Sequence, residues 1–163
     1  MKLRPWRPGD EPSLVKYANN RKISINMRDR FPFPYTQADA ESWIKLANET
    51  DPVENFAIEF ENQAVGGIGL MLGTDIYRKS AEIGYWLGEP YWGKGLMAEA
   101  VKRMTEYGFE TFGLNRIFAG VFESNSASAR VLEKAGYAFE YRTAKSVYKE
   151  GRYLDQLFYV KLR

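Results

Sequence analysis

The stretch from Ala81 to Ala100, AEIGYWLGEPYWGKGLMAEA, decides the fold. An apolar, aromatic run at 83–87 meets a turn that contains Pro90, then the triplet Gly93-Lys94-Gly95, then an alanine-rich segment with helical spacing. This order predicts a strand, a tight loop and the start of a helix. Because the first N–H groups of a helix lack partners within it, a glycine loop with a lysine there suits an anion such as phosphate. We therefore expect a ligand that bears phosphate.

Length and composition narrow the possibilities. With 163 residues, 45% of them hydrophobic and 27% charged, the chain is expected to form one domain, residues 1–163, whose core needs no disulfide or metal. Its formal net charge of +2 provides no broad field for nucleic acid. There is no cysteine and no histidine, which excludes thiol nucleophiles, histidine-based triads and zinc sites built on those residues.

The sequence also bears on where the protein works. Residues 1–12 contain charges and prolines but no apolar run like that of a signal peptide, and no apolar stretch of about 18 residues could span a membrane. We therefore expect a cytoplasmic protein, a monomer or homodimer, that binds no metal, no nucleic acid and no membrane.

Hydrophobic spacing along the rest of the chain predicts alternating helices and strands. The predicted order is strand, two helices, three strands, helix, strand, helix and two strands, which indicates an α/β layer fold with a partly antiparallel sheet. In chain order, the elements are a strand at 2–6, a helix after Asp10, a helix at about 37–49, strands at 55–60, 64–72 and 81–88, a helix at about 96–112, a strand at 117–122, a helix that ends at Gly136, and a hairpin of 137–147 with 152–162.

Local signals mark several boundaries. Asp10 is expected to cap the first helix, Thr36 followed by Asp39 resembles a capping box, and Asn125 or Ser126 is expected to cap the last helix.

Two other segments have unusual composition. Prolines deny regular structure to the run Phe31-Pro32-Phe33-Pro34-Tyr35, whose rings suit either packing over the core edge or lining a substrate site. The glycines at 66, 67 and 69 lie inside a predicted strand, where glycine often marks a bulge or a close approach of another chain segment.

The glycine loop does not match the common nucleotide motifs. Gly88 to Lys94 nearly fits the P-loop pattern, but Gly95 stands where a Ser or Thr would bind magnesium. The glycine spacing also differs from the dinucleotide fingerprint. Two possibilities remain from these residues alone: a phosphate site of another kind, or a tight turn with no ligand.

Two long motifs together resemble one family. Trp92-Gly93-Lys94-Gly95-Leu96-Met97, preceded by Glu82–Leu87, resembles the Gcn5-related N-acetyltransferase (GNAT) superfamily, and NSASARVLEKAGY at 125–137 is similar to its branch of ribosomal-protein N-terminal (alanine) acetyltransferases. The resemblance extends from Leu3 to Leu162. It implies a three-layer α/β fold with a mixed, mostly antiparallel sheet of about seven strands, splayed at the cofactor site, and about four helices.

The resemblance also implies the cofactor and how it is held. Acetyl-CoA would be the co-substrate, its pyrophosphate on the main-chain N–H groups of residues 93–98, its pantetheine arm along the strand before them, and its phosphates near Lys94 and Arg130. The implied cofactor-binding residues are Tyr85, Trp86, Leu87, Trp92, Gly93, Lys94, Gly95, Leu96, Met97, Ala98, Asn125, Ser128 and Arg130.

The implied catalytic residues leave alternatives open. Glu82 corresponds to a catalytic glutamate of the superfamily and could take a proton from the incoming amine, or it could be a structural partner of a nearby cation. Where many relatives place a tyrosine acid this chain has Leu132, so Ser128 is the substitute by position, or it only hydrogen-bonds the cofactor. A glutamate of the ribosomal-protein enzymes corresponds to Val147 here.

These assignments imply an N-acetyltransferase that moves acetyl to a primary amine, at a protein N-terminus or on a small molecule, by direct attack. The acceptor would enter between the loop at 23–35 and the hairpin near 147–155, with Arg28, Phe31, Phe33 and Tyr35 as substrate residues. Asp155 would fix a loop or sit near the acceptor amine. The alternative, suggested by Leu132 and Val147, is an acetyl-CoA-binding module that has lost catalysis.

Overall fold

The computed structural model describes residues 1–163. Its elements are β1 (Lys2–Pro5), α1 (Glu11–Ala18), α2 (Arg21–Ser24), α3 (Gln37–Ala47), β2 (Asn55–Phe60), β3 (Gln63–Leu72), η1 (Asp75–Tyr77), β4 (Ser80–Leu87), η2 (Glu89–Tyr91), α4 (Leu96–Thr111), β5 (Arg116–Phe122), α5 (Ser126–Lys134), β6 (Ala138–Lys149) and β7 (Arg152–Leu162). None of the helices combines the length and the apolar character needed to cross a bilayer.

The strands form a seven-stranded sheet in the order β1-β2-β3-β4-β5-β7-β6, mostly antiparallel, with β4 and β5 parallel. The predicted mixed sheet is therefore confirmed, and there are five helices, of which α2 has only four residues. The chain forms two compact units: unit 1 contains residues 1–69 and 85–100, and unit 2 contains residues 70–84 and 101–163. Each is described in turn.

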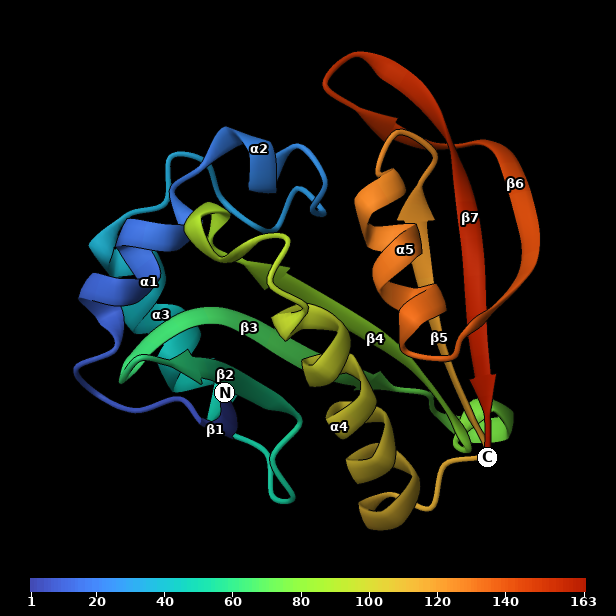
Figure 1. Cartoon of the computed structure of the whole chain (residues 1–163), viewed down its shortest axis with the longest axis horizontal. Helices are drawn as coiled ribbons and strands as arrows, with labels where there is room; N and C mark the ends of the chain where they lie inside the picture. Colours follow the sequence, from blue (N-terminus) through green and yellow to red (C-terminus); the bar gives the residue numbers. More distant parts are fainter. The chain divides into compact units, whose positions relative to one another are not determined.

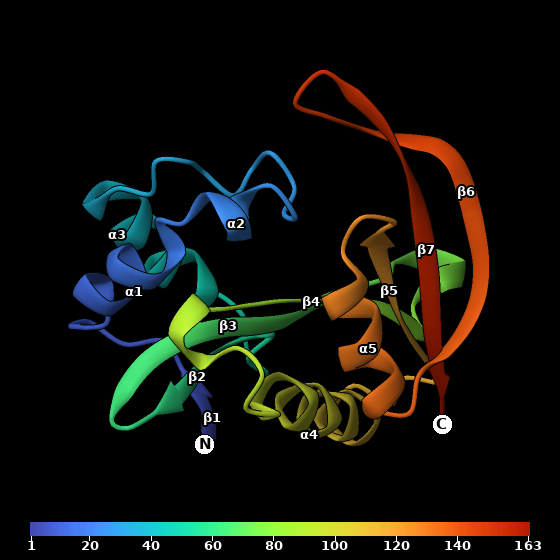
Figure 2. The same ribbon diagram turned by 45° about the horizontal axis from the view of Figure 1, so that its top comes forward.

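In unit 1, the sheet begins with three antiparallel strands. β1 pairs with β2 from Lys2 opposite Glu59 to Pro5 opposite Phe56, and β2 pairs with β3 across a two-residue turn. Glu61 and Asn62 in that turn both have positive φ, 50° and 61°, as a type I′ hairpin turn requires. α1 and α3 lie side by side (Figures 1 and 2). The fully buried side chains of this unit include Leu14, Ala40, Ile58 and Val65.

The glycines of β3 allow close approach, as predicted. A Cβ added to Gly66 would lie 2.5 Å from the Trp86 carbonyl oxygen, and one added to Gly67 would lie 2.7 Å from the Trp86 indole nitrogen. The β2–β3 register also shifts at Ile58/Glu59, so this hairpin contains a bulge as well.

Asp10 occupies the N-cap position of α1, as predicted, but its side chain does not cap the helix. Its side chain makes no capping bond; instead it accepts hydrogen bonds from the Arg4 guanidinium, at 2.7 and 2.8 Å, and from the Arg7 N–H, at 3.1 Å. Arg4 also pairs with Glu59, whose pKa it lowers. A bidentate pair with arginine is stronger than a bond to a neutral N–H, so the buried Asp10 carboxylate ties α1 to β1 and β2.

The other predicted caps are confirmed. The Thr36 hydroxyl accepts from the Asp39 N–H at 3.2 Å and the Asp39 carboxylate accepts from the Thr36 N–H at 2.8 Å, which completes the capping box of α3. The sequence did not predict α2, because four residues are too few to show helical periodicity.

In unit 2, β5 connects the sheet to the C-terminal hairpin. β4 pairs with β5 in parallel over Ser80–Glu82, and β7 lies between β5 and β6, antiparallel to both (Figures 1 and 2). α5 lies beside β5 in both views. Side chains that are almost wholly buried form the core of this unit: Val101, Met104, Leu114, Ile117 and Leu132.

Glycines with positive φ mark the end of α5 and the turn of the C-terminal hairpin. Gly136, at φ +85°, ends α5, and the Tyr137 N–H bonds to the Leu132 carbonyl as in a Schellman motif. The β6–β7 turn contains Glu150 and Gly151 at φ 48° and 78°, which is again the type I′ arrangement. β6 has a register shift between Thr143 and Val147, so residues 144–146 bulge from the ladder.

Candidate functional site

The glycine loop at 92–95 joins η2 to α4 and has an open, left-handed backbone. Gly93 and Gly95 have φ of +75° and +77°, values that favour glycine, and a Cβ added at either would meet no atom within 4 Å. The Glu99 N–H donates to the Gly95 carbonyl at 3.2 Å, the first bond of the helix. The N–H groups of residues 96–98 therefore precede the intrahelical ladder, where they can serve an anion.

Two side chains of the loop fold back onto neighbouring residues. The Trp92 indole N–H donates to the Leu87 carbonyl at 2.7 Å, which anchors the loop to the end of β4. The Lys94 ammonium lies 5.2 Å from the centre of the Tyr91 ring, within the range of a cation–π contact. The Trp92 side chain thus has a structural bond, and the main-chain N–H groups remain on the loop.

The turn that precedes the loop, residues 88–92, is held by an uncharged cluster on one side. The Tyr91 hydroxyl lies 3.0 Å from the Tyr17 hydroxyl, which in turn donates to Gln63 Oε1 at 2.8 Å. The hydrogen bond to Tyr17, followed by burial, raises the pKa of Tyr91. Both rings are buried and meet edge to face at 5.4 Å. The tie therefore consists of packed rings and neutral hydroxyls.

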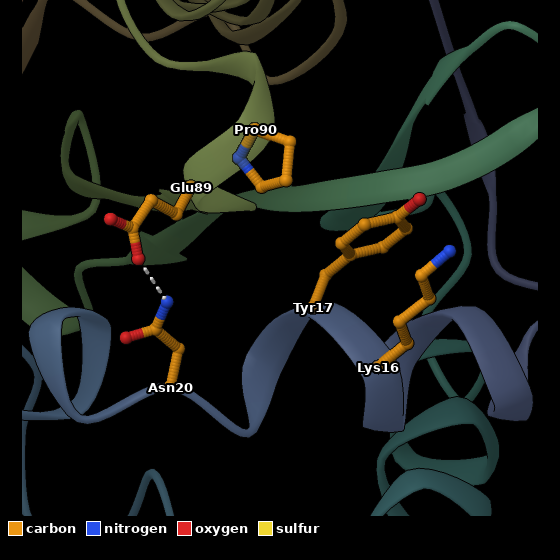
Figure 3. Close-up of a pocket in the computed structure, with 5 residues that line it drawn as sticks. All are labelled: Lys16, Tyr17, Asn20, Glu89 and Pro90. Atoms are coloured by element: carbon orange, nitrogen blue, oxygen red, sulfur yellow. Dashed lines mark hydrogen bonds between the residues drawn. The ribbon is translucent and has the colours of Figure 1, made fainter.

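A charged tie holds the same turn to α2 and its N-cap residue, Asn20. Glu89 accepts from the Asn20 amide at 2.8 Å (Figure 3) and from the Lys22 ammonium. The Lys22 bond, and then the Asn20 bond, lower the pKa of Glu89. Beside this tie is a cavity of about 330 Å³, lined by Lys16, Tyr17, Asn20, Glu89 and Pro90 (Figure 3). None of the predicted cofactor-binding residues lines it.

The strand residues predicted to follow the pantetheine arm differ in burial. Trp86 and Leu87 are buried, whereas Tyr85 is half-buried. The first two side chains therefore belong to the core of unit 1, and only the backbone of Tyr85–Leu87 suits pairing with a ligand.

The four predicted substrate residues separate into two groups. Phe31 packs against Trp86, with ring centres 5.9 Å apart, and against Tyr35, which is buried. Burial, and then the Asp39 charge, raise the pKa of Tyr35 to about 12. Phe33 is 47% exposed and Arg28 is exposed as well. Tyr35 thus belongs to the edge of the core, the half-buried Phe31 packs beside it, and Phe33 and Arg28 are the exposed members of the set.

In unit 2, Glu82 stands where the pairing of β4 with β5 ends. It is half-buried and opposite Phe118, the last pair of that parallel ladder, while residues 119–122 of β5 continue to pair with β7. The next residues of β4 include Gly84, which is exposed and has open space where a Cβ would be. The sheet is therefore open beyond Glu82, as the predicted splay requires.

The start of α5 presents the second predicted motif. Asn125 caps the helix, its side-chain oxygen accepting from the Ser128 N–H at 3.2 Å; the amide NH₂ is a donor group that this bond does not use. Ser128 is half-buried, and Arg130 is exposed, with a long 3.5 Å bond to the Ser126 hydroxyl. Leu132 is completely buried, so no proton donor stands at that position.

Asp155 fixes a loop, one of the two roles expected for it. Its carboxylate accepts from the Lys145 N–H at 2.8 Å, inside the β6 bulge, and pairs with Arg142. These two bonds, the backbone one first, lower its pKa. Val147, where relatives place a glutamate, pairs with Leu154 across the hairpin.

The sequence did not predict the long-range bonds that hold the turn at 88–92 and the turn at 122–128. Tyr17 and Tyr91 are separated by 74 residues, and Glu123 and Asp155 by 32 residues. No local pattern connects such residues, and the only available signal was the unusual number of aromatic residues, 15% of the chain.

The profile of the family described as Acetyltransferase (GNAT) domain matches residues 1–138. An N-acetyltransferase of Bacillus licheniformis, p20, is 32% identical over 173 aligned positions, which cover 99% of this chain and 92% of that protein.

Two solved structures are similar in fold. One is a spermidine N-acetyltransferase from Vibrio cholerae in complex with CoA and spermine, at 23% identity and a TM-score of 0.80, covering 99% of this chain and 94% of that one. The other is a ribosomal-protein-S5-alanine acetyltransferase from Vibrio fischeri, at 22% identity and a TM-score of 0.79, covering 98% and 91%.

Proposed function

This chain belongs to the acetyltransferase (GNAT) domain family, and we propose that it moves the acetyl group of acetyl-CoA to a primary amine by direct attack. The observation that supports this most is the glycine loop. Gly93 and Gly95 adopt left-handed backbone with open space above them, immediately before the unpaired N–H groups of a sixteen-residue helix. A cradle of main-chain N–H groups at a helix start fits a pyrophosphate.

The other residues implied by the two motifs would hold the rest of the cofactor. Main-chain N–H groups of 93–98 would bind the pyrophosphate, with Lys94 and Arg130 supplying positive charge. The backbone of 85–87 would pair with the pantetheine arm, and the Asn125 amide would donate to it. When bound, acetyl-CoA supplies an acetyl group that is already activated as a thioester.

The chain's own proton-handling groups are few. Glu82, half-buried at the end of the β4–β5 pairing, would accept a proton from the incoming ammonium, directly or through water. Ser128 would donate a hydrogen bond toward the departing sulfur. Because the chain has no cysteine and no histidine, we expect the amine to attack without an acyl-enzyme.

The acceptor belongs to the primary amines, and two kinds are suggested by similar proteins. The Vibrio cholerae structure contains spermine, and the Vibrio fischeri enzyme is named for a ribosomal protein. Exposed Arg28 and Phe33 are the proposed acceptor contacts. The buried Leu132 favours one alternative, a module that binds acetyl-CoA without turnover, because it removes the tyrosine acid of many relatives.

Two measurements test this proposal. Calorimetry with acetyl-CoA tests binding, and thiol release with a panel of polyamines and N-terminal peptides tests turnover. Glu82→Gln should lower kcat by roughly 10²–10⁴-fold, the usual contribution of a general base, and leave the Kd of acetyl-CoA unchanged. Glu110→Gln, an exposed glutamate on α4, is the matched control and should change neither value. An unchanged kcat and pH profile in Glu82→Gln would reject the base, and binding without turnover on any amine would favour the inactive module.

A further inference from the structure

We propose that Arg142 is a positioning residue: through Glu123 and Asp155 it fixes the turn that presents Asn125. The turn is defined here as residues 122–128 and is called the Asn125 turn. The inference rests on the proposed function, because it assigns Asn125 to the cofactor, but the cluster itself is a property of unit 2. It adds a residue on β6 that none of the family motifs contains.

Three charged side chains from three elements meet beside this turn. Arg142 on β6 pairs with Asp155 on β7 and donates to Glu123 Oε2 at 3.2 Å. Glu123 follows β5 directly, and its other carboxylate oxygen accepts from the Asp155 N–H at 3.1 Å. The Asp155 side chain is only 14% exposed, against 55% for Arg142 and 39% for Glu123. The aspartate is therefore the shielded centre of the cluster.

The main chain joins the same residues. The Glu123 N–H donates to the Asp155 carbonyl at 3.0 Å, which extends the β5–β7 pairing by one residue, and the Asn125 N–H donates to the Phe122 carbonyl at 2.8 Å. Glu123 is thus bonded to Asp155 through both its backbone and its side chain. Since Asn125 is two residues further on and its N–H bonds to the Phe122 carbonyl, the tether at Glu123 restrains the start of the turn that contains Asn125.

Arginine is the residue that this arrangement needs. Glu123 and Asp155 are two carboxylates held against one another, and like charges at close range repel. A guanidinium offers several donors in a planar fork and can serve both carboxylates at once, whereas a lysine ammonium is a single point charge. Without Arg142, repulsion from Asp155 would push the Glu123 side chain away from the N–H that it now accepts.

The experiment compares Arg142→Met, Arg142→Lys and a matched control, Arg116→Met. Arg116 also joins strand to strand in unit 2, pairing with Glu140 of β6, but it lies at the opposite end of β5 from the Asn125 turn. Arg142→Met should raise the Kd of CoA, measured by calorimetry, by up to about tenfold, since at most one neutral hydrogen bond from Asn125 is displaced. Arg142→Lys should lie between Met and the unchanged protein, and Arg116→Met should match the unchanged protein.

A second measurement needs no ligand. Hydrogen exchange in the free protein should accelerate at the amides of residues 123–128 in Arg142→Met and stay unchanged there in Arg116→Met. Equal effects of the two variants on Kd, or unchanged exchange at 123–128, would overturn the proposal, since Arg142 would then only support the hairpin. If the unchanged protein binds no CoA, the proposed function fails, and the exchange data still decide whether Arg142 holds the turn.

Discussion

The glycine-loop turn at 88–92 and the Asn125 turn at 122–128 both precede a helix start with a proposed cofactor contact, yet they are held differently. The first is held by packed rings and neutral hydroxyls, Tyr17 with Tyr91, and by the pair of Glu89 with Lys22. The second is held by charges, through Glu123, Arg142 and Asp155. Buried neutral contacts are little affected by salt or acid, whereas exposed ion pairs weaken with both. The two turns should therefore respond differently to conditions and to substitution.

The two turns also present different kinds of hydrogen-bond donor to the proposed cofactor. The glycine loop offers main-chain N–H groups, whose direction depends on backbone φ, so the backbone itself must be rigid. Asn125 offers a side-chain amide, whose place depends on where the turn is tethered. A polar cluster on the surface is sufficient for such a tether.

The largest expected effect comes from the glycine loop itself. Gly95→Ala places a side chain at φ +77°, which costs about 1–2 kcal/mol in the left-handed region. If the variant loop leaves that conformation when free, restoring it on binding raises the Kd of acetyl-CoA by roughly five- to thirtyfold. Calorimetry measures this value.

Gly113→Ala is the matched control for that change. Gly113 also has positive φ, +57°, just after α4, but it lies outside the loop. Its substitution should lower the free energy of unfolding and leave the Kd unaltered. A Kd that stays within twofold in Gly95→Ala would show that the loop conformation does not matter for binding.

What the sequence predicted was local. The strand, loop and helix around Gly93 follow from neighbouring residues, as does the capping box of Thr36 and Asp39, because each partner lies within a few positions of the other. Asp10 was placed correctly at the N-cap of α1, but its side chain makes no capping bond because Arg4, on another element, takes the same carboxylate. The mostly antiparallel sheet of about seven strands and its opening came from the resemblance, whereas the strand order was not predicted, since hydrophobic periodicity does not specify which strands are neighbours.

The same distinction between local patterns and long-range contacts applies to the candidate site. The loop glycines, Asn125 and Glu82 belong to motifs and could be named in advance. The ties that place them, such as Tyr17 to Tyr91 across 74 residues, depend on the folded chain and have no local pattern. The side chains of Trp86 and Leu87 are buried, and the predicted pairing of this strand with the pantetheine arm involves its backbone.

Lowering the pH should remove the stability that Asp155 contributes to the Asn125 turn, an effect of intermediate size. The pKa of Asp155 is lowered by the Lys145 N–H and by Arg142, so its bonds stabilise the folded state fully above the ordinary aspartate pKa of about 4. That stability is lost as the pH falls through the lowered value. Urea unfolding of the unchanged protein and of Asp155→Asn should therefore give free energies that differ at pH 7 and converge below about pH 4. A difference that persists unchanged at pH 3 would contradict the charged character of this tether.

The smallest effect should come from the uncharged tie. Tyr91→Phe removes one hydroxyl, but Tyr17 keeps its bond to Gln63 and the ring remains to pack beneath Lys94, so no buried group is orphaned. The free energy of unfolding should fall by about 0.5–1.5 kcal/mol, the contribution of one hydrogen bond, and the Kd of acetyl-CoA should change less than twofold. Because the pKa of Tyr91 is raised above its ordinary value of about 10, this loss should be the same at pH 4 and pH 7 and in low and high salt. Unfolding curves of the unchanged protein and Tyr91→Phe under those four conditions measure it, and a loss that shrinks in acid or salt would contradict the uncharged character of the Tyr17–Tyr91 tie.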